Sequence, residues 1–324
     1  MKNLVVGLLA LGLGGCSSPS PAGRDWQVAV ELDDGAILSF WGASAQDVFA
    51  VGGSMLENGG AAIVLRHNTN GWQRVPITAT PTLWWVHGFG PNDVWAVGER
   101  GTITHFDGNA WTTVATGALY TLWGVWGPAP DELWAVGGQA NVGAPSVLLH
   151  YDGITWSEVP DIGVPDELLF KVWGTSASDV YVVGTEGAVL YFDGNTWTRP
   201  PSGTSERLLT VRGRGPGEVY AVGGLVTSQL AHGSQGTWTA SDVNLGAGLM
   251  GLWTAPAEPL VGAGFSGLLA IDDGEGFRVQ PALVYDDLHA TWGDDQGNLL
   301  AGGGNLLYLG ARRGVILSVG DFAI

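Results

Sequence analysis

The chain has 324 residues, including 53 glycines and 16 tryptophans, and its formal net charge is −18. Glycine destabilises helices and aromatic side chains suit the faces of sheets, so this composition excludes a mainly helical protein and favours short strands joined by tight turns. The negative charge repels nucleic acid, which we therefore exclude as a partner.

The N-terminal segment is expected to be an export signal. Lys2 precedes an apolar run too short to span a bilayer comfortably, and small residues follow it. These features are typical of a secretory signal peptide. The run ends in Leu13-Gly14-Gly15-Cys16, which resembles the lipobox of bacterial lipoproteins. The resemblance implies a signal peptide over residues 1–15 and a lipidated tether over residues 16–24. An ordinary signal with a coincidental cysteine is the alternative.

Cys16 is the only cysteine in the chain, so its acylation would leave no thiol for a disulfide, a metal or a nucleophile. Ser17 follows it where lipoproteins held at the inner membrane often carry aspartate. The resemblance therefore implies an exported protein that is lipid-anchored at the outer membrane.

A pattern of about forty residues recurs seven times over residues 25–320. Each copy has an apolar run, usually a Trp-Gly pair, a short loop that mostly closes with an acid, and a second apolar run such as "DVYVVG". The second residues of the copies are Trp41, His87, Trp126, Trp173, Arg212, Trp253 and Trp292. Strand-only repeats of this length predict a propeller. We expect an all-β, seven-bladed β-propeller of four-stranded antiparallel blades over residues 25–324.

The copy around residue 180 shows how one blade is expected to form. Strands a to d are read as "LFKVWG", "DVYVVG", "AVLYFDG" and "TWTRPP", and Asp193-Gly194 is a hairpin turn between c and d. The aspartate that closes the a–b loop, here Asp179, is expected to bond to loop amides. The strand-d tryptophans Trp111, Trp156 and Trp197 are expected to pack between blades.

The N-terminal segment "DWQVAVEL", Asp25–Leu32, has the pattern of a strand d. We expect it to complete the last blade beside "NLLAGGG" and "NLLYLG", because propellers remove free edges by pairing an N-terminal with a C-terminal strand. The segment "GVILSVG" at Gly314–Gly320 is a second candidate for the fourth strand of that blade.

The repeat resembles more than one propeller family. "AVGG" followed by "HYDGITW" is similar to a kelch repeat, and "VWG…ELWAVGG…HYDGITW" is similar to tectonin-type repeats, whose members often bind glycans. The Asp-box of sialidase-type propellers is a looser match, because Asp193 lies four and not five residues before Trp197. These resemblances imply a propeller and leave its family open.

The ionisable residues do not form a motif for catalysis or metal binding. His105, His150 and His232 hold equivalent places in different copies, so a ring would keep them too far apart to share one ion. Ser266 is expected in a turn and not in a nucleophile elbow. The acidic pairs Asp272-Asp273, Asp286-Asp287 and Asp294-Asp295 lack the calcium-loop order, which favours solvated loops over a calcium site. We expect no catalytic residue, metal or cofactor.

Two classes of function remain. The first is a monomeric, non-catalytic binding module that recognises a protein or glycan of the cell envelope, and the alternative is a sialidase-like or other glycoside hydrolase. The b–c and d–a loops vary most in length, and binding is usually carried by such loops, although insertions are also tolerated at little energetic cost. The candidate ligand-binding residues on these loops are Glu57, Asn58, Arg100, Tyr120, Gln139, Asn141, Glu186, Arg207 and Tyr285.

Overall fold

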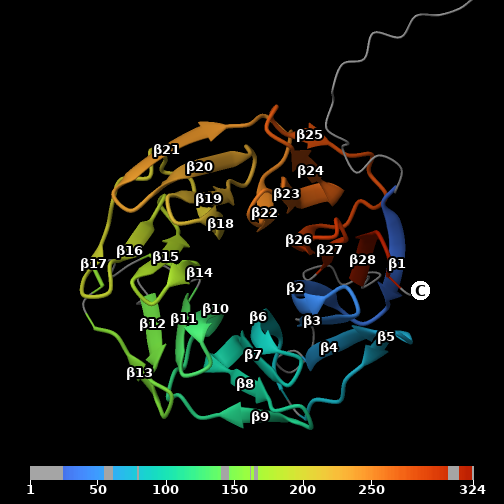
Figure 1. The fold of residues 1–324 in the computed structure, drawn as a ribbon, viewed down its shortest axis with the longest axis horizontal. Helices are drawn as coiled ribbons and strands as arrows, with labels where there is room; N and C mark the ends of the chain where they lie inside the picture. The colour runs from blue at the N-terminus through green and yellow to red at the C-terminus, as the bar shows by residue number, and fades with distance from the viewer. Residues whose placement is uncertain are drawn as a thin grey trace, which may run out of the picture.

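The computed structural model describes residues 25–54, 61–78, 80–139, 146–160, 162–163, 167–305 and 314–322. Over these residues the chain forms seven four-stranded antiparallel sheets arranged in a ring (Figure 1). The predicted seven-bladed β-propeller is confirmed. Strand a of each sheet lies nearest the ring axis and strand d forms the outer wall.

The blades follow the repeats in chain order. Blade 1 has β2 (Ala36–Ser44), β3 (Asp47–Ser54), β4 (Ala61–Asn68) and β5 (Gly71–Arg74). Blade 2 has β6 (Leu83–Gly90), β7 (Asp93–Gly98), β8 (Ile103–Phe106) and β9 (Trp111–Val114). Blade 3 has β10 (Thr121–Ala129), β11 (Glu132–Gly138), β12 (Ser146–Tyr151) and β13 (Trp156–Glu158). Blade 4 has β14 (Leu169–Ser176), β15 (Asp179–Gly184), β16 (Val189–Phe192) and β17 (Trp197–Thr198).

Blades 5 and 6 complete the part of the ring built from consecutive strands. Blade 5 has β18 (Leu208–Gly215), β19 (Glu218–Gly223), β20 (Gln229–Ser234) and β21 (Thr237–Asp242). Blade 6 has β22 (Leu249–Trp253), β23 (Leu260–Gly264), β24 (Leu269–Asp272) and β25 (Arg278–Val279).

Blade 7 joins the two ends of the chain. It has β26 (Leu288–Gly293), β27 (Leu299–Gly304), β28 (Gly314–Val319) and the N-terminal strand β1 (Gln27–Leu32). β1 is antiparallel to β28, with Gln27 opposite Ser318 and Leu32 opposite Gly314. The predicted closure by the N-terminal strand is confirmed. "GVILSVG" supplies the third strand of this blade and not the fourth, whereas residues 306–310 of "NLLYLG" lie outside the described residues.

The Trp-Gly pair of the repeat locks neighbouring blades together. A Cβ atom added to Gly174 in blade 4 would lie 2.8 Å from the Trp126 ring of blade 3. A Cβ atom on Gly88 would likewise lie 2.9 Å from the Trp41 ring of the preceding blade. Each tryptophan therefore needs a glycine on the next blade, because no other residue leaves room for the indole.

The strand-d tryptophans pack between blades, as predicted. Trp156 of blade 3 is 8% exposed, and its ring centroid lies 6.0 Å from that of Trp95 in blade 2. Trp197 of blade 4 lies 5.4 Å from Trp134 of blade 3 in an edge-on arrangement. These contacts place an aromatic cluster in the seam between successive sheets.

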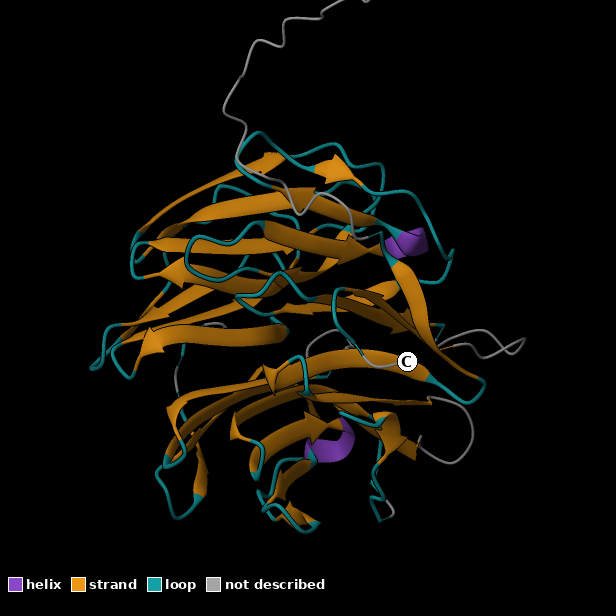
Figure 2. Cartoon of the chain, turned by 45° about the vertical axis from the view of Figure 1, so that its right-hand side comes forward, coloured by secondary structure: helices purple, strands orange, loops and turns teal. Residues whose placement is uncertain are grey.

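Helical structure is limited to two short segments in the part of the chain that the structure describes. They are the 3₁₀ segments η1 (Glu99–Gly101) and η2 (Phe265–Gly267), visible among the strands in Figure 2. Within the same residues, no helix has the length and apolar character needed to cross a membrane.

Candidate functional site

Most ionisable side chains of the repeat form hydrogen bonds or stacking contacts between strands of their own blade. In blade 2, His105 on strand c stacks on Trp95 of strand b at 4.2 Å between centroids, and its Nε2 lies 2.7 Å from Asp93. The same cross-strand positions hold Phe49 and Arg66, Trp134 and His150, Tyr181 and Tyr191, and Tyr220 and His232 in other blades. These histidines are therefore structural members of separate blades. Across the described residues, no three histidine, cysteine or acidic side chains are grouped closely enough to hold a metal ion.

The acids that close the a–b loops bond to side chains, so the predicted bonds to loop amides were wrong. Asp47 accepts two hydrogen bonds from the Arg66 guanidinium, at 2.8 and 2.9 Å. Asp179 accepts from the hydroxyls of Thr175 and Tyr181. These acids lie one strand away from a basic or hydroxyl side chain, and charge-assisted bonds to such groups are stronger than neutral ones.

The amide-binding role belongs instead to the aspartates of the c–d hairpins. Asp107 accepts hydrogen bonds from the amides of Asn109 and Ala110, at 2.8 and 3.0 Å. The amide of Ala110 is the main reason why the pKa of Asp107 lies below its usual value. Asp152 and Asp193 repeat the arrangement. These hairpins are structural turns, as their uniform length suggested.

The b–c and d–a loops share one face of the ring, as expected from the strand order. Gly101 of a b–c turn donates its amide to the carbonyl of Tyr120 in a d–a loop, at 2.7 Å. Gly224 in the b–c loop of blade 5 makes the same kind of bond to Arg207, at 3.0 Å. We call this side the loop face, and it consists of the b–c and d–a loops of the described residues.

Two predicted residues occupy strained turns on the loop face. Arg100 in blade 2 and Glu186 in blade 4 have φ values of 56° and 52°, and Ser266 holds the equivalent place in blade 6 at 56°. Each precedes a glycine that also has positive φ, which makes these segments type I′ turns. The left-handed conformation costs a non-glycine residue about 1–2 kcal/mol. Such strain is often kept where a side chain serves a purpose.

The other predicted residues are distributed around the same face. Tyr285 is 89% exposed, Gln139 is exposed, and Tyr120 and Arg207 are partly buried. Arg100 and Tyr120 lie on segments joined by the Gly101 bond, whereas the others belong to separate blades. The predicted residues Glu57, Asn58 and Asn141 lie outside the described residues.

Sequence reasoning missed three exposed apolar residues on the loop face. Leu119 is 81% exposed in the loop between blades 2 and 3, and Leu225 and Val226 are 46% and 82% exposed in the b–c loop of blade 5. The sequence could have indicated them, because these large aliphatic residues occur in loops otherwise built from polar and small residues. Leu225 and Val226 are adjacent in one loop, whereas Leu119 belongs to a loop between other blades.

The innermost strands also carry a repeated irregularity that the sequence did not reveal. In every blade the pairing of strand a with strand b shifts register near the start of strand a. Examples are the shifts between Leu83 and Trp85 and between Leu122 and Gly124. The extra residues are Leu38, Trp84, Trp123, Phe170, Leu209, Met250 and His289. The rings of Trp84 and Trp123 lie 4.4 Å apart, so blades 2 and 3 contact each other near the axis through these bulges.

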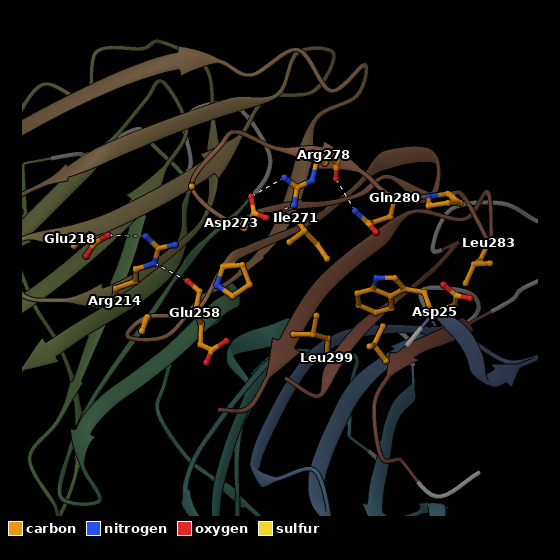
Figure 3. A pocket seen from close by; sticks show the side chains of 16 residues that line it. Asp25, Arg214, Glu218, Glu258, Ile271, Asp273, Arg278, Gln280, Leu283 and Leu299 are labelled. Carbon is orange, nitrogen blue, oxygen red and sulfur yellow. Dashed lines mark hydrogen bonds and ion pairs between the residues drawn. The ribbon is translucent and has the colours of Figure 1, made fainter. Parts of the chain in front are cut away.

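A cleft of about 1100 Å³ lies on the opposite side, between blades 5, 6 and 7 (Figure 3). Arg214 there donates to Glu218 at 2.9 Å and to the carbonyl of Glu258 at 3.0 Å. Arg278 pairs with Asp273 at the outer wall. The cleft is lined by a–b and c–d segments, by Trp26 and by Gln280, Pro281 and Leu283 of the segment that follows β25. None of the predicted binding residues is among its lining residues.

The acidic pairs serve as loop acceptors. Asp287 accepts a hydrogen bond from the amide of Ser266 at 2.9 Å, and Asp294 accepts from the amides of Gln296 and Asn298. Ser266 itself stands in η2, so its predicted role as a turn residue is confirmed.

The fold and these loops define a protein of the seven-bladed β-propeller class. No protein-family model matches the sequence, and no curated protein is significantly similar to it. Solved structures share the fold. YCF48 from Cyanidioschyzon merolae is similar with a TM-score of 0.66 at 12% identity, covering 91% of this chain and 98% of that one. YCF48 bound to D1 peptide gives 0.67 at 15% identity, covering 94% and 100%.

A third similar structure is the WD40 β-propeller domain of Doa1. Its TM-score is 0.69 at 10% identity, and the match covers 91% of this chain and 97% of that one. At identities this low the likeness establishes a common architecture alone.

Proposed function

We propose that the protein is a non-catalytic binding module of the bacterial cell envelope, anchored at the outer membrane through Cys16, whose loop face recognises another envelope protein. We also propose that its repeats belong to the kelch or tectonin type that they resemble. The observation that carries it is the set of exposed apolar side chains, Leu119, Val226 and Tyr285, on a rigid ring. Aliphatic and aromatic side chains of this size contribute most when a protein surface buries them.

A protein partner suits this surface better than a glycan. Leu119 and Val226 offer no hydrogen-bonding group to a sugar hydroxyl, whereas apolar side chains are commonly buried at the core of a protein interface. Arg100 and Glu186 provide charged groups on the same face, in turns with fixed backbones. The structural neighbour YCF48 bound to D1 peptide is a propeller with a bound peptide, which supports the same mode here.

The route of the chain into the ring supports an outward loop face. Asp25 and Trp26 line the cleft on the a–b/c–d side, next to the end of β28 at Val319. The tether between Cys16 and Asp25 can reach at most about 30 Å. In this proposal the a–b/c–d side faces the membrane, and the loop face points away from it toward partners.

The proposal is tested by chemical crosslinking of the full chain in intact envelopes, followed by mass spectrometry. Tyr285→Ala combined with Val226→Ser should abolish capture of the partner protein. Ile154→Ser is the matched control, because Ile154 is 84% exposed in a c–d hairpin on the opposite side. Loss of capture in the control with retention in the double variant would show that the wrong face was chosen. Binding of a purified glycan with no captured protein would refute the partner class.

A second pair of variants separates the charge of Arg100 from the fold. Arg100→Gly relieves the left-handed strain, so the variant should be as stable as the parent or more so while binding weakens. Ser266→Gly makes the same backbone change in the equivalent turn of blade 6 and should keep full binding. Equal binding in the two variants would remove Arg100 from the site.

A glycoside hydrolase remains the second candidate because of one carboxyl group in the cleft. Burial, followed by the charges of Asp295 and Asp294, raises the pKa of Glu258, which is what a general acid requires. A retaining or inverting enzyme also needs a free second carboxylate. Glu218 is bound by Arg214 and by the Tyr220 hydroxyl, so it is committed to the blade. Hydrolysis of nitrophenyl glycosides that is lost in Glu258→Gln would favour this candidate over the binding module.

A further inference from the structure

Two cationic side chains from separate blades contact one aromatic ring of the innermost strands. Lys171 on β14 places its Nζ 4.3 Å from the ring centre of Trp85 on β6. Arg212 on β18 places its Cζ 5.2 Å from the same ring. These strands are the innermost of blades 4, 2 and 5, so the contact spans the interior of the propeller (Figure 1).

The two cations have few hydrogen-bond acceptors. Lys171 donates from Nζ to the carbonyl of Trp123 at 2.7 Å, which uses one of its three donors. The Nε of Arg212 is buried and has no hydrogen-bond partner among the described residues. A guanidinium has five donors, and leaving a buried charged donor unsatisfied is unfavourable. The cluster therefore has donor capacity that the described protein does not use.

The cluster is also unbalanced in charge, although the whole chain is strongly acidic. Burial and the nearby charge of Arg212 lower the pKa of Lys171 to about 7, and burial lowers that of Arg212 to about 10. The neighbouring His87 and His289 are likewise shifted down by burial and by these two cations. Asp287 is the one acid that acts on this group, and it acts on His289. Among the described residues, no carboxylate neutralises Lys171 or Arg212.

We propose that the axial cluster of Lys171, Arg212 and Trp85 binds a small oxyanion, such as phosphate or a carboxylate. Both side chains are of intermediate exposure on the innermost strands. The planar fork of the guanidinium matches two oxygens of such an anion, and the ammonium adds a second positive charge nearby. The site goes beyond the proposed function, since it lies on the inner strands and does not depend on a partner at the loop face.

The alternative is a closed plug in which the cations serve only to cover the Trp85 ring. Cation–π contacts can stabilise such an arrangement without any anion. The two roles differ in one measurable property. An anion bound beside Lys171 would favour the charged form of Lys171, whereas a plug would leave its titration independent of the anion.

Lysine-selective NMR of the purified full chain distinguishes these roles directly. The sequence has two lysines, Lys2 and Lys171, so ¹³C-lysine labelling gives at most two titrating signals. Without phosphate, Lys171 should titrate near its lowered pKa of about 7. Saturating phosphate at constant ionic strength should move this titration upward by at least half a unit, and acetate should test the carboxylate arm. A titration that neither anion moves overturns the proposal.

Calorimetry with inorganic phosphate gives the affinity and its dependence on the cluster. Binding should be saturable, with one ion per chain. For acetate, whose charge is constant between pH 8 and 6, binding should strengthen as the pH falls because Lys171 gains its proton. Arg212→Gln should weaken binding at least about tenfold. Lys171→Arg keeps the positive charge and should retain binding. Arg74→Gln removes a surface guanidinium paired with Asp34 and should leave binding unchanged.

The outcomes separate a built site from non-specific binding. Equal weakening in Arg212→Gln and Arg74→Gln would show that phosphate responds to overall charge and would overturn the site. Should Arg212→Gln fail to fold, Trp85→Phe retains a ring for the cations, and the NMR titration of the parent protein still decides between anion and plug. Loss of partner capture at the loop face with intact phosphate binding would reject the proposed function and leave this site standing.

Discussion

Replacing Trp156 by alanine tests whether the strand-d aromatics hold the ring together or bind a ligand. Trp156 is 8% exposed, stacks on Tyr151 at 5.3 Å between centroids and meets Trp95 of the preceding blade at 6.0 Å. Truncating a buried aromatic residue costs about 3–5 kcal/mol, because apolar contact is lost and a cavity remains. For a domain of this size the cost corresponds to a fall in Tm of about 5–15 °C.

The measurement is denaturant unfolding of the full chain, followed by tryptophan fluorescence and circular dichroism. Ile154→Ala is the matched control, since Ile154 lies two residues earlier in the same blade and is 84% exposed. Its unfolding free energy should change by less than about 0.5 kcal/mol. Trp156→Phe should recover part of the loss by retaining a ring. A stable Trp156→Ala variant that no longer captures its partner would show that this reasoning is wrong and that Trp156 belongs to a binding site.

Three further predictions concern the lipid anchor, the closure of the ring and the titration of His87. Metabolic labelling with a lipid probe should mark the wild type and not Cys16→Ser, whose fold should be unchanged; labelling that persists in the variant would refute lipidation. Deleting residues 17–33 removes β1 and should lower the Tm by many degrees, and an unaltered melt would contradict closure by that strand. Burial, with help from Arg212, lowers the pKa of His87 to about 4, so the unfolded chain binds more protons between pH 6.5 and 4. The free energy of unfolding should therefore decrease as the pH is lowered from 6.5 to 4. This part of the pH dependence should disappear in His87→Gln.

The architecture could be predicted because the repeated Trp-Gly pair reflects a packing contact between successive blades. Trp126 on one blade requires Gly174 on the next, so the Trp-Gly spacing in the sequence records a contact between blades. The Asp-Gly turns and the strand-d tryptophans are equally local signals. Closure by β1 could also be inferred, because the pattern around Trp26 matches a strand d. The third strand was assigned wrongly, because "NLLYLG" was expected there and "GVILSVG", which forms it, was considered only for the fourth.

The functional residues were harder to predict because they meet only after the ring closes. Arg212 stands out in its repeat only as a replacement of tryptophan, and no local spacing places Lys171, Arg212 and Trp85 at one point. The roles of Asp47 and Asp93 were misread for a related reason. Their partners lie one strand away, on Arg66 and His105, and the loop sequence alone suggested amide bonds.

Because β1 pairs with β28, the ring can close only after the C-terminal strand has been synthesised. Leu32 pairs with Gly314, so β1 can pair only after nearly the whole chain has been synthesised. Closing so long a loop carries an entropy cost that grows only slowly with length, but contacts of such separation form slowly. Until then, strand edges in blade 7 stay open to pairing with other chains. A polypeptide cut short before residue 314 would keep that open edge permanently, and the edge would stay available for pairing with other chains.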